Sequence, residues 1–271
     1  MKGLTPSAIA RCASLALREE LAAYPKPGLV SLVDTGSHPD MDAPCFLASI
    51  ECLETFFERM AEAGEAGCSL DSLQRIGVAA EGAMCTVTGG RNTHRGAIFC
   101  LGLLAAAAGQ QTTGGASGLG EIIANSWGRE LLMPGDLPSG SEGLAMCHRH
   151  GISGARGEAK RGFPSVYEIG LPALRKTLPR VPLPTASVQV FFEILAQCED
   201  TTLLKRGGAE GFRYARGEAL RFLDCGGVLG ADWETGAIGI HRAFVERNLT
   251  AGGTADLLAA TLFVHHLEEL V

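Results

Sequence analysis

The sequence contains no apolar run long enough to cross a membrane. Its most apolar stretch, residues 97–108, falls well short of the ~20 residues that a spanning helix needs. Charged side chains interrupt the N-terminal segment, where a signal peptide would need an unbroken apolar stretch. We therefore expect a soluble protein of the cytoplasm that has no membrane partner.

Positive charge is scarce. The chain has 23 Lys and Arg against 30 Asp and Glu, which gives a net charge of −7. The overall field of such a protein repels polyanions, so broad binding to nucleic acid or to an anionic membrane is not expected. A local basic pocket for a small anion remains compatible with this charge balance.

The nine cysteines lack the spacing of a zinc site or a disulfide framework. Their number is odd, their spacing is irregular and no CxxC pair occurs. We expect buried thiols instead. A chain of 271 residues can bury a sufficient core without disulfides or a structural metal.

The two-residue alternation that is typical of strands is missing as well. The best strand candidate, residues 29–33, is short and has no evident pairing partner. Helical periodicity covers nearly all of the remaining chain. The sequence therefore predicts an all-α fold of about nine to eleven helices, in a single domain that spans residues 1–271.

Start and stop signals divide the chain into helices. Thr5, Asp42 and Ser69 are expected to cap the first three, which should run to about residues 23, 66 and 88. Asn92 or Thr93 is expected to cap a fourth helix that ends near residue 108. The other helical patterns lie near residues 117–133, 139–150, 164–178, 185–198, 208–225, 232–248 and 254–270, whereas residues 151–162 are interpreted as a loop.

Glycine is unusually abundant, with 36 residues and no collagen period. We expect these glycines at turns, at helix ends and where segments approach closely. Several glycine-containing segments also carry charged side chains, and these are the candidate sites.

The first candidate segment, residues 26–42, places Asp34, His38 and Asp40 behind Lys26. Oxygen ligands in an irregular loop suit Mg²⁺, which takes one or two carboxylates together with substrate phosphates. The competing interpretation is that the polar residues form turns and that Asp42 caps a helix.

The second candidate segment, residues 89–96, opens the apolar fourth helix with Arg91, His94 and Arg95. Free backbone N–H groups at a helix N-terminus attract anions, and two glycines allow close approach to the backbone. The spacing is not that of a Walker A loop. The alternative is a helix cap with solvated arginines.

Two further segments combine glycine with basic residues. Residues 151–162 include Arg156 and Glu158, and residues 199–208 include Asp200, Lys205 and Arg206. The former is typical of a basic loop over phosphates or of a solvated loop. The latter indicates either a site or a helix end whose cations suit its dipole. Residues 250–256 are interpreted as a loop and helix cap.

In their order along the chain, these segments resemble the triphosphoribosyl-dephospho-CoA synthase family. The stretch GFPSVYEIGLPAL at 162–174 is more similar to the malonate decarboxylase branch than to the citrate lyase branch. The chain departs from the family pattern at Thr202, where DTN is usual, and at Thr250-Ala251, where Ser-Pro is usual. The segments that carry the resemblance are KPGLVSLVDTGSHPDMD at 26–42, EGAM at 81–84, GGRNTHRGAIFCLGLLAAAAG at 89–109, HGISGARGEAKRGFPSVYEIGLPAL at 150–174, DTTLLKRGG at 200–208 and AGGTADLLAATLF at 251–263.

The resemblance implies an all-helical transferase that takes ATP and 3′-dephospho-CoA and releases adenine. Its product would be 2′-(5″-triphosphoribosyl)-3′-dephospho-CoA, the precursor of the prosthetic group on a decarboxylase or lyase acyl carrier protein. The product would then pass to a carrier-protein transferase. The oligomeric state is not predicted.

Such a reaction must anchor a triphosphate, activate a ribose hydroxyl and neutralise the leaving adenine. For the triphosphate we nominate Lys26, Arg91, Asn92, Thr93, Arg95, Arg156, Lys205 and Arg206. For Mg²⁺ the candidates are Asp34, Asp40, Glu81 and Asp200. For acid–base catalysis they are Asp34, His38, Glu158 and His94, the last as a donor to adenine or phosphate.

Two other functions are compatible with the same segments. A Mg²⁺-dependent nucleotide or ADP-ribose hydrolase would use water as acceptor and would not need dephospho-CoA. A non-catalytic helical module would bind a CoA-like molecule without releasing adenine. The number of carboxylates placed near phosphate-binding residues argues against the second of these.

Overall fold

The computed structural model describes residues 4–114, 118–132 and 151–270. In these ranges the chain forms helices and connecting loops and contains no strand. The predicted all-α fold is therefore confirmed, and the strand candidate at 29–33 is wrong, because these residues belong to an irregular loop with turns.

The first three helices begin at the predicted caps. Their bounds are Pro6–Ala22 for α1, Ala43–Glu65 for α2 and Leu70–Val87 for α3. The side chains of Thr5, Asp42 and Ser69 each accept a hydrogen bond from a backbone N–H of the first turn. Each cap satisfies an amide that the helix itself leaves without a partner.

The fourth helix, α4 (Arg95–Gly114), is capped by Asn92, whose Oδ1 accepts from Arg95 N at 3.0 Å. It runs past the predicted end near residue 108. The reason is tertiary: Gly109 packs against the carbonyl of Ala61, as Gly64 packs against that of Ala106. Gly109, which follows the predicted end of the helix, instead lies within α4, where its missing side chain allows α2 and α4 to approach closely.

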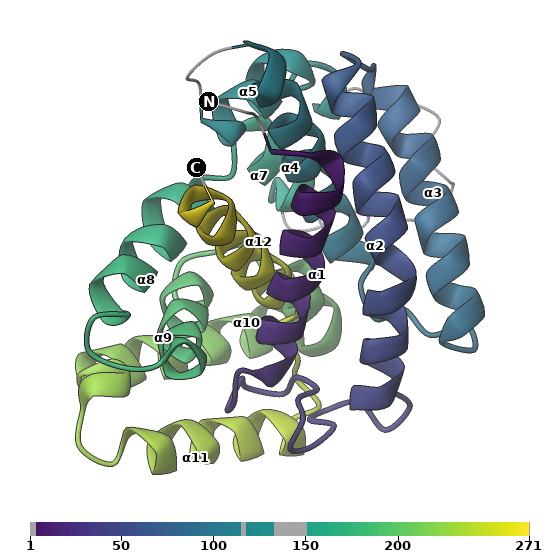
Figure 1. Cartoon of the computed structure of the whole chain (residues 1–271). Coiled ribbons are helices and arrows are strands. Elements are labelled where there is room, and N and C mark those ends of the chain that lie inside the picture. The colour runs from purple at the N-terminus through teal and green to yellow at the C-terminus, as the bar shows by residue number, and fades with distance from the viewer. Residues whose placement is uncertain (1–3, 115–117, 133–150, 271) are drawn as a thin grey trace.

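After α4 the chain forms several short helices and turns, the long kinked helix α10, and the terminal helix α12 (Figure 1). The predicted helix at 164–178 is a π-helical turn that continues into α8, and the helix predicted at 139–150 lies outside the described residues. The bounds are Leu119–Ser126 (α5), Glu130–Leu132 (η1), Gly154–Lys160 (α7), Ser165–Gly170 (η2), Leu171–Thr177 (α8), Leu183–Leu195 (α9), Thr201–Asp224 (α10), Gly227–Leu229 (η3), Trp233–Glu246 (α11) and Gly252–Glu269 (α12).

Two predictions about glycine segments are wrong. Residues 151–162, expected as a loop, contain α7, with Gly154 and Gly162 at positive φ at its two ends and Gly157 packed on Ser153. The predicted helix start near residue 208 lies at Thr201 instead. Gly208 (φ 59°, ψ −162°) kinks α10 without ending it, because glycine alone adopts such a conformation without strain.

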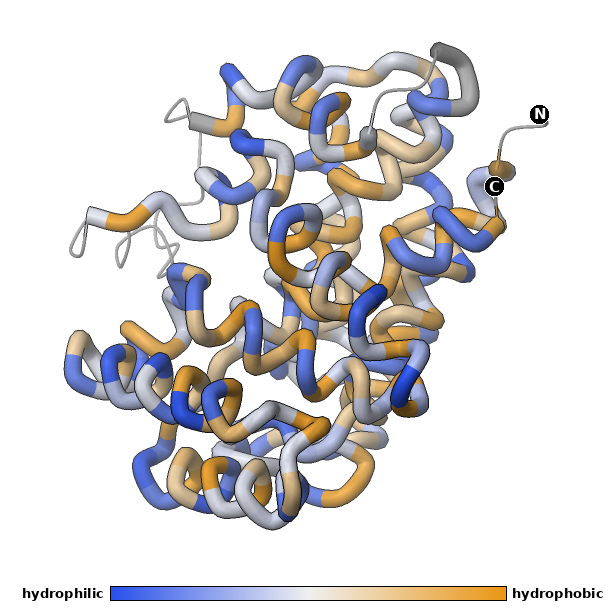
Figure 2. The backbone as a smooth tube through the Cα atoms, turned by 90° about the vertical axis from the view of Figure 1, so that its left-hand side faces the viewer, coloured by the Kyte–Doolittle hydropathy of each residue, from blue (hydrophilic) through white to orange (hydrophobic). Residues whose placement is uncertain are grey.

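One hydrophobic cluster runs from Ile9 in α1 to Leu267 in α12. The terminal helix α12 packs on α1, α4 and α9 and joins the two ends of the chain. The outer helices alternate hydrophilic and hydrophobic residues along their coils, as Figure 2 shows. Among the described residues, no helix has the length and apolarity that crossing a bilayer requires.

The eight described cysteines are all free thiols. Cys12, Cys100 and Cys198 are buried, as expected for this residue type. The expectation of burial is wrong for Cys225, which is exposed at the end of α10.

Candidate functional site

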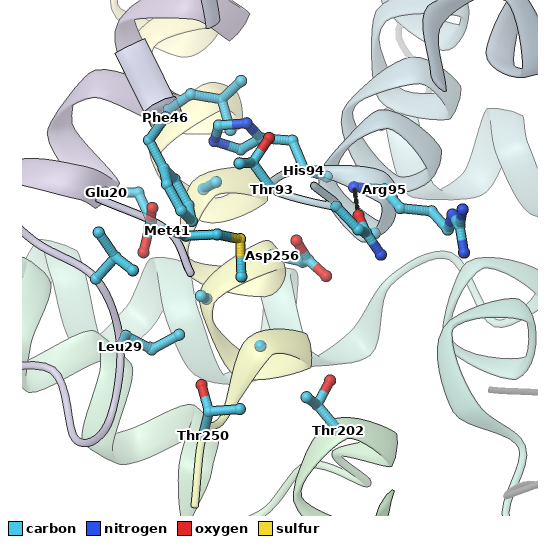
Figure 3. A pocket seen from close by; sticks show the side chains of 18 of the residues that line it. Glu20, Leu29, Met41, Phe46, Thr93, His94, Arg95, Thr202, Thr250 and Asp256 are labelled. Atoms are coloured by element: carbon cyan, nitrogen blue, oxygen red, sulfur yellow. Dashed lines mark hydrogen bonds between the residues drawn. The ribbon is translucent and has the colours of Figure 1, made fainter. Parts of the chain in front are cut away.

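A cavity of about 170 Å³, lined by both apolar and polar side chains, lies where six segments meet. These are the end of α1, the loop between α1 and α2, the start of α2, the first turn of α4, and the starts of α10 and α12 (Figure 3). Pockets that enclose a whole drug-sized ligand measure ~300–1,000 Å³. The cavity therefore suits one ring of a larger molecule, whose remainder would extend over the surrounding surface.

The first turn of α4 forms one wall of this pocket. Its amide groups already have protein partners: Asn92 accepts from Arg95 N, and the carboxylate of Asp256 accepts from Ala97 N. A Cβ atom on Gly96 would lie only 1.8 Å from Asp256 Oδ2, so this contact requires glycine. The sequence predicts that this helix N-terminus binds an anion. In the structure, the carboxylate of Asp256 already accepts one of its N–H groups.

His94 faces the pocket from the same turn and is buried. Its Nδ1 lies 2.7 Å from the hydroxyl of Ser49, which in turn accepts a hydrogen bond from Thr93. Burial lowers the pKa of His94 to about 3, with the nearby Lys26 charge as a smaller cause. The ring is therefore neutral at physiological pH.

This hydrogen-bond chain also sets the tautomer of His94. Ser49 accepts from Thr93, and Nδ1 of His94 is the one acceptor that its own proton meets among the described residues, so we assign the ring proton to Nε2. His94 Nε2 is buried and has no hydrogen-bond partner. An unpaired donor of this kind costs stability unless a ligand satisfies it.

His38 lies on the opposite side of the pocket and is held differently. Arg206 donates to its Nδ1 at 3.2 Å, so the ring proton resides on Nε2 and is donated to Thr250 Oγ1 at 3.0 Å. Burial, with the Arg206 charge as a second cause, lowers the pKa of His38. Both ring nitrogens are occupied, and Arg206 is anchored further by Ser37 O and the Asn248 side chain.

Lys26 is buried and does not line the pocket. Its ammonium group donates to the carboxylate and to the backbone carbonyl of Glu20. Burial lowers the pKa of Lys26, and the Glu20 charge opposes that shift. Lys26 therefore pairs with a carboxylate of the pocket wall. The sequence predicts a contact with phosphate for this lysine instead.

Asp34 lies on the outer side of the loop between α1 and α2. Its Oδ1 accepts from Gly36 N and lies 3.2 Å from Nε2 of His241 in α11. Asp40 is exposed between His38 and Met41, both of which line the pocket. The structure therefore separates these two candidate metal ligands.

Asp200 is a junction between two helices. Its Oδ1 accepts from Thr202 N and Leu203 N of α10, and its Oδ2 accepts from the backbone N–H and the hydroxyl of Thr254 in α12. Burial raises the pKa of Asp200, and these hydrogen bonds oppose the shift. With both oxygens engaged by the protein, this carboxylate is poorly placed to bind a metal.

The remaining cations lie nearer the surface. Arg95 lines the pocket and pairs with Glu81 at 2.8 Å. Arg91 is exposed and donates to the carbonyl of Thr88. Lys205 is exposed on the first turns of α10, next to Arg206.

The segment around α7 does not line the pocket. Glu158 is buried and accepts from Ser165 N, and Arg156 donates to the carbonyl of Leu131. Burial lowers the pKa of the Arg156 guanidinium. The start of this segment is linked to the 199–208 segment because Ser153 donates to the Glu199 carboxylate.

Comparison with known proteins assigns the family. The pattern of the family described as ATP:dephospho-CoA triphosphoribosyl transferase (CitG) matches residues 6–271. The chain belongs to this family.

Several relatives support the assignment. A protein of Albidiferax ferrireducens named probable 2-(5″-triphosphoribosyl)-3′-dephosphocoenzyme-A synthase is 36% identical, covering 97% of this chain and 92% of the relative. Proteins named 2-(5″-triphosphoribosyl)-3′-dephosphocoenzyme-A synthase from Pectobacterium atrosepticum (93% of this chain, 86% of the relative) and Klebsiella pneumoniae (97% and 92%) are each 36% identical too. No solved structure matches the chain.

Thr202 and Thr250, where a departure from the triphosphoribosyl transferase family pattern is predicted, both line the pocket. Thr202 and Thr250 line its lower wall in Figure 3, and a Cβ on Gly252 would lie 3.1 Å from Thr202 Oγ1. Thr202 and Thr250 are 48 residues apart in the sequence, yet both lie on the wall of this pocket.

Two carboxylates at the pocket, Asp256 and Glu20, are not among the site residues that the sequence predicts. The sequence pattern places Asp256 in a helix cap instead. A signal existed for Asp256: it is an isolated charge in the otherwise apolar start of α12. A charged residue at such a position is rarely buried without a partner or a role.

Proposed function

We propose that the protein transfers the triphosphoribosyl group of ATP to the 2′-hydroxyl of 3′-dephospho-CoA and releases adenine. The observation that carries this proposal is the convergence of the family segments 26–42, 89–96, 200–208 and 250–256 on one pocket, to which they bring its histidines, hydroxyls and the Asp256 carboxylate. The name of the matched family and those of the relatives support the same reaction.

The chemistry is a displacement at the anomeric carbon of the ATP ribose. A β-nucleoside that gives an α-linked product undergoes one inversion, which fits direct attack through an oxocarbenium-like transition state. The pocket volume suits the ribose at which bonds are exchanged, and the triphosphate would lie outside it, near Arg95, Arg206 and Arg91. His94 would offer its neutral Nε2–H to the bound nucleotide.

We further propose that Mg²⁺ arrives as part of the ATP substrate. No three His, Cys, Asp or Glu side chains in the described ranges are grouped to hold a metal ion. A Mg²⁺ ion bound to phosphates needs only one or two protein carboxylates and keeps several waters. The exposed Asp40, between two pocket residues, fits a single contact of that kind, and the ion would neutralise phosphate charge.

The destination of the product is also a proposal. The stretch at 162–174 supports the malonate decarboxylase branch, in which a carrier-protein transferase would attach the prosthetic group. ATP and dephospho-CoA are metabolites of the cytoplasm, where we place the reaction.

The decisive experiment is a mass-balanced incubation with ATP, Mg²⁺ and 3′-dephospho-CoA. Free adenine and the mass of the CoA species are followed by chromatography and mass spectrometry. We expect equal amounts of adenine and triphosphoribosyl adduct, both absent when dephospho-CoA is omitted. Adenine or phosphate released without dephospho-CoA would instead identify a hydrolase, and binding without turnover would identify a non-catalytic module.

A further inference from the structure

We propose that Asp256 is the general base that takes the proton from the attacking 2′-hydroxyl. This role rests on the proposed transferase function and adds a catalytic residue to it. Figure 3 shows the Asp256 carboxylate inside the pocket, between Met41 and the start of α4.

The other titratable groups of the pocket are poorly suited to accept this proton. Glu20 is already engaged in an ion pair and a hydrogen bond with the buried ammonium of Lys26. His38 has both ring nitrogens engaged, by Arg206 and Thr250. His94 is held neutral with its proton on Nε2, so it presents a donor to the pocket.

Asp256, in contrast, is a carboxylate in the pocket that has no cation paired with it among the described residues. It accepts the backbone N–H of Ala97, and Gly96 provides the space for its Oδ2. The charged groups that face it are carboxylates, Glu20 from α1 and Asp200 from the start of α10, while α4 presents the Cys100 thiol. A carboxylate among like charges gains strongly from taking up a proton.

Burial is the largest cause that raises the pKa of Asp256 well above its ordinary value, followed by the charges of Asp200 and Glu20. A raised pKa makes the ionised carboxylate a stronger base than an ordinary aspartate. The same carboxylates repel phosphates. They therefore favour a ribose in the pocket and a triphosphate toward the arginines.

The reaction step balances without a further reactant. The 2′-oxygen bonds to C1′ of the ATP ribose while the C1′–N9 bond breaks, and the electron pair of that bond leaves with adenine. The hydroxyl proton passes to an oxygen of Asp256. Adenine then takes one proton from water, and Asp256 returns one to water.

The test is Asp256→Asn, assayed for adenine and adduct at several pH values. Asparagine keeps an oxygen for the Ala97 N–H but cannot accept a proton. We expect kcat to fall about 10²–10⁴-fold, with dephospho-CoA binding, measured by calorimetry, changed less than about threefold. We also expect the wild-type kcat/KM to decline on the acid side, and this decline to be absent from the residual activity of the variant.

Asp71→Asn is the matched control, because Asp71 is an exposed carboxylate on α3 that pairs with Arg75 away from the pocket. It should keep wild-type kcat. A purely structural Asp256 would make Asp256→Asn less stable than wild type in thermal unfolding. Removal of a half-buried carboxylate that faces other carboxylates should instead leave its Tm unchanged or raised.

A second variant, Gly96→Ala, keeps the carboxylate but displaces it, because the new methyl would lie 1.8 Å from Oδ2. We expect kcat to fall more than KM changes. If either folded variant keeps wild-type kcat while the wild type forms adduct, the base assignment is overturned and the transferase function stands. If the wild type forms no adduct, both the function and this role are overturned.

Discussion

Two histidines face the pocket, and their neighbours hold both as neutral rings with defined protons. Arg206 can only donate, so it forces the proton of His38 onto Nε2. Thr93 and Ser49 set the proton of His94 on the equivalent atom. The pocket thus presents the Nε2–H of His94 at a fixed place, which suits the recognition of a nucleotide oxygen or nitrogen, whereas the proton of His38 is engaged by Thr250.

At this residue scale, His94 should make stability depend on pH. Its pKa is about 3 when folded and ~6.5 when unfolded, so below pH 6.5 the unfolded chain binds a proton that the native state does not. We expect the free energy of unfolding of the wild type to fall by about 2 kcal/mol between pH 7 and pH 5 because of His94. His94→Gln should abolish this part of the pH dependence. Urea denaturation at both pH values measures it. Identical pH slopes for wild type and variant would contradict the neutral buried ring.

At the scale of secondary-structure elements, Asp200 joins α10 to α12 through four hydrogen bonds. Because Asp200→Ala leaves several buried donors unsatisfied, we expect it to cost about 3 kcal/mol or more. Asp42→Ala, which removes an N-cap that accepts one backbone hydrogen bond on α2, is the control and should cost about 1 kcal/mol. Free energies of unfolding in urea compare them. Equal losses would show that Asp200 acts as an ordinary cap.

The kink in α10 gives a second prediction for this scale. Gly208 has φ 59° and ψ −162°, with open space where a side chain would be. Gly208→Ala should therefore destabilise the protein by ~1–3 kcal/mol through backbone strain alone. Gly217→Ala, in a regular part of α10 with equally open space, should be neutral or stabilise by up to ~1 kcal/mol. Thermal unfolding of the two variants should move in opposite directions, and parallel shifts would argue against the kink.

At the scale of the whole molecule, ligand binding should report how Mg²⁺ is held. If the ion arrives with ATP, EDTA should leave the Tm of the nucleotide-free protein unchanged. ATP with Mg²⁺ should raise Tm more than ATP alone, because the magnesium complex is then the ligand with the lower Kd. A ligand at 100 times its Kd stabilises the native state by ~2.7 kcal/mol. A thermal-shift assay with the four combinations measures this. An EDTA-induced fall in Tm without nucleotide would instead indicate a resident metal.

The segments that line the pocket are predictable from the sequence, whereas the contacts of several residues within them are not. The caps at Thr5, Asp42 and Ser69 were predictable because an N-cap depends on a few adjacent residues. The partners of Asp200 and Lys26 were not, because these contacts join segments far apart in the chain.

The amino-acid sequence predicts that the protein is all-helical, where most helices begin, and which glycine-containing segments carry its polar groups. Periodicity and capping are local, so they can be recognised along the chain. The ion pair of Lys26 with Glu20, and the position of Asp256 in the same pocket as His94, depend on how the helices pack. Burial and electrostatic coupling depend on the packing of α1, α4 and α12 against one another, and no short stretch of sequence contains that information.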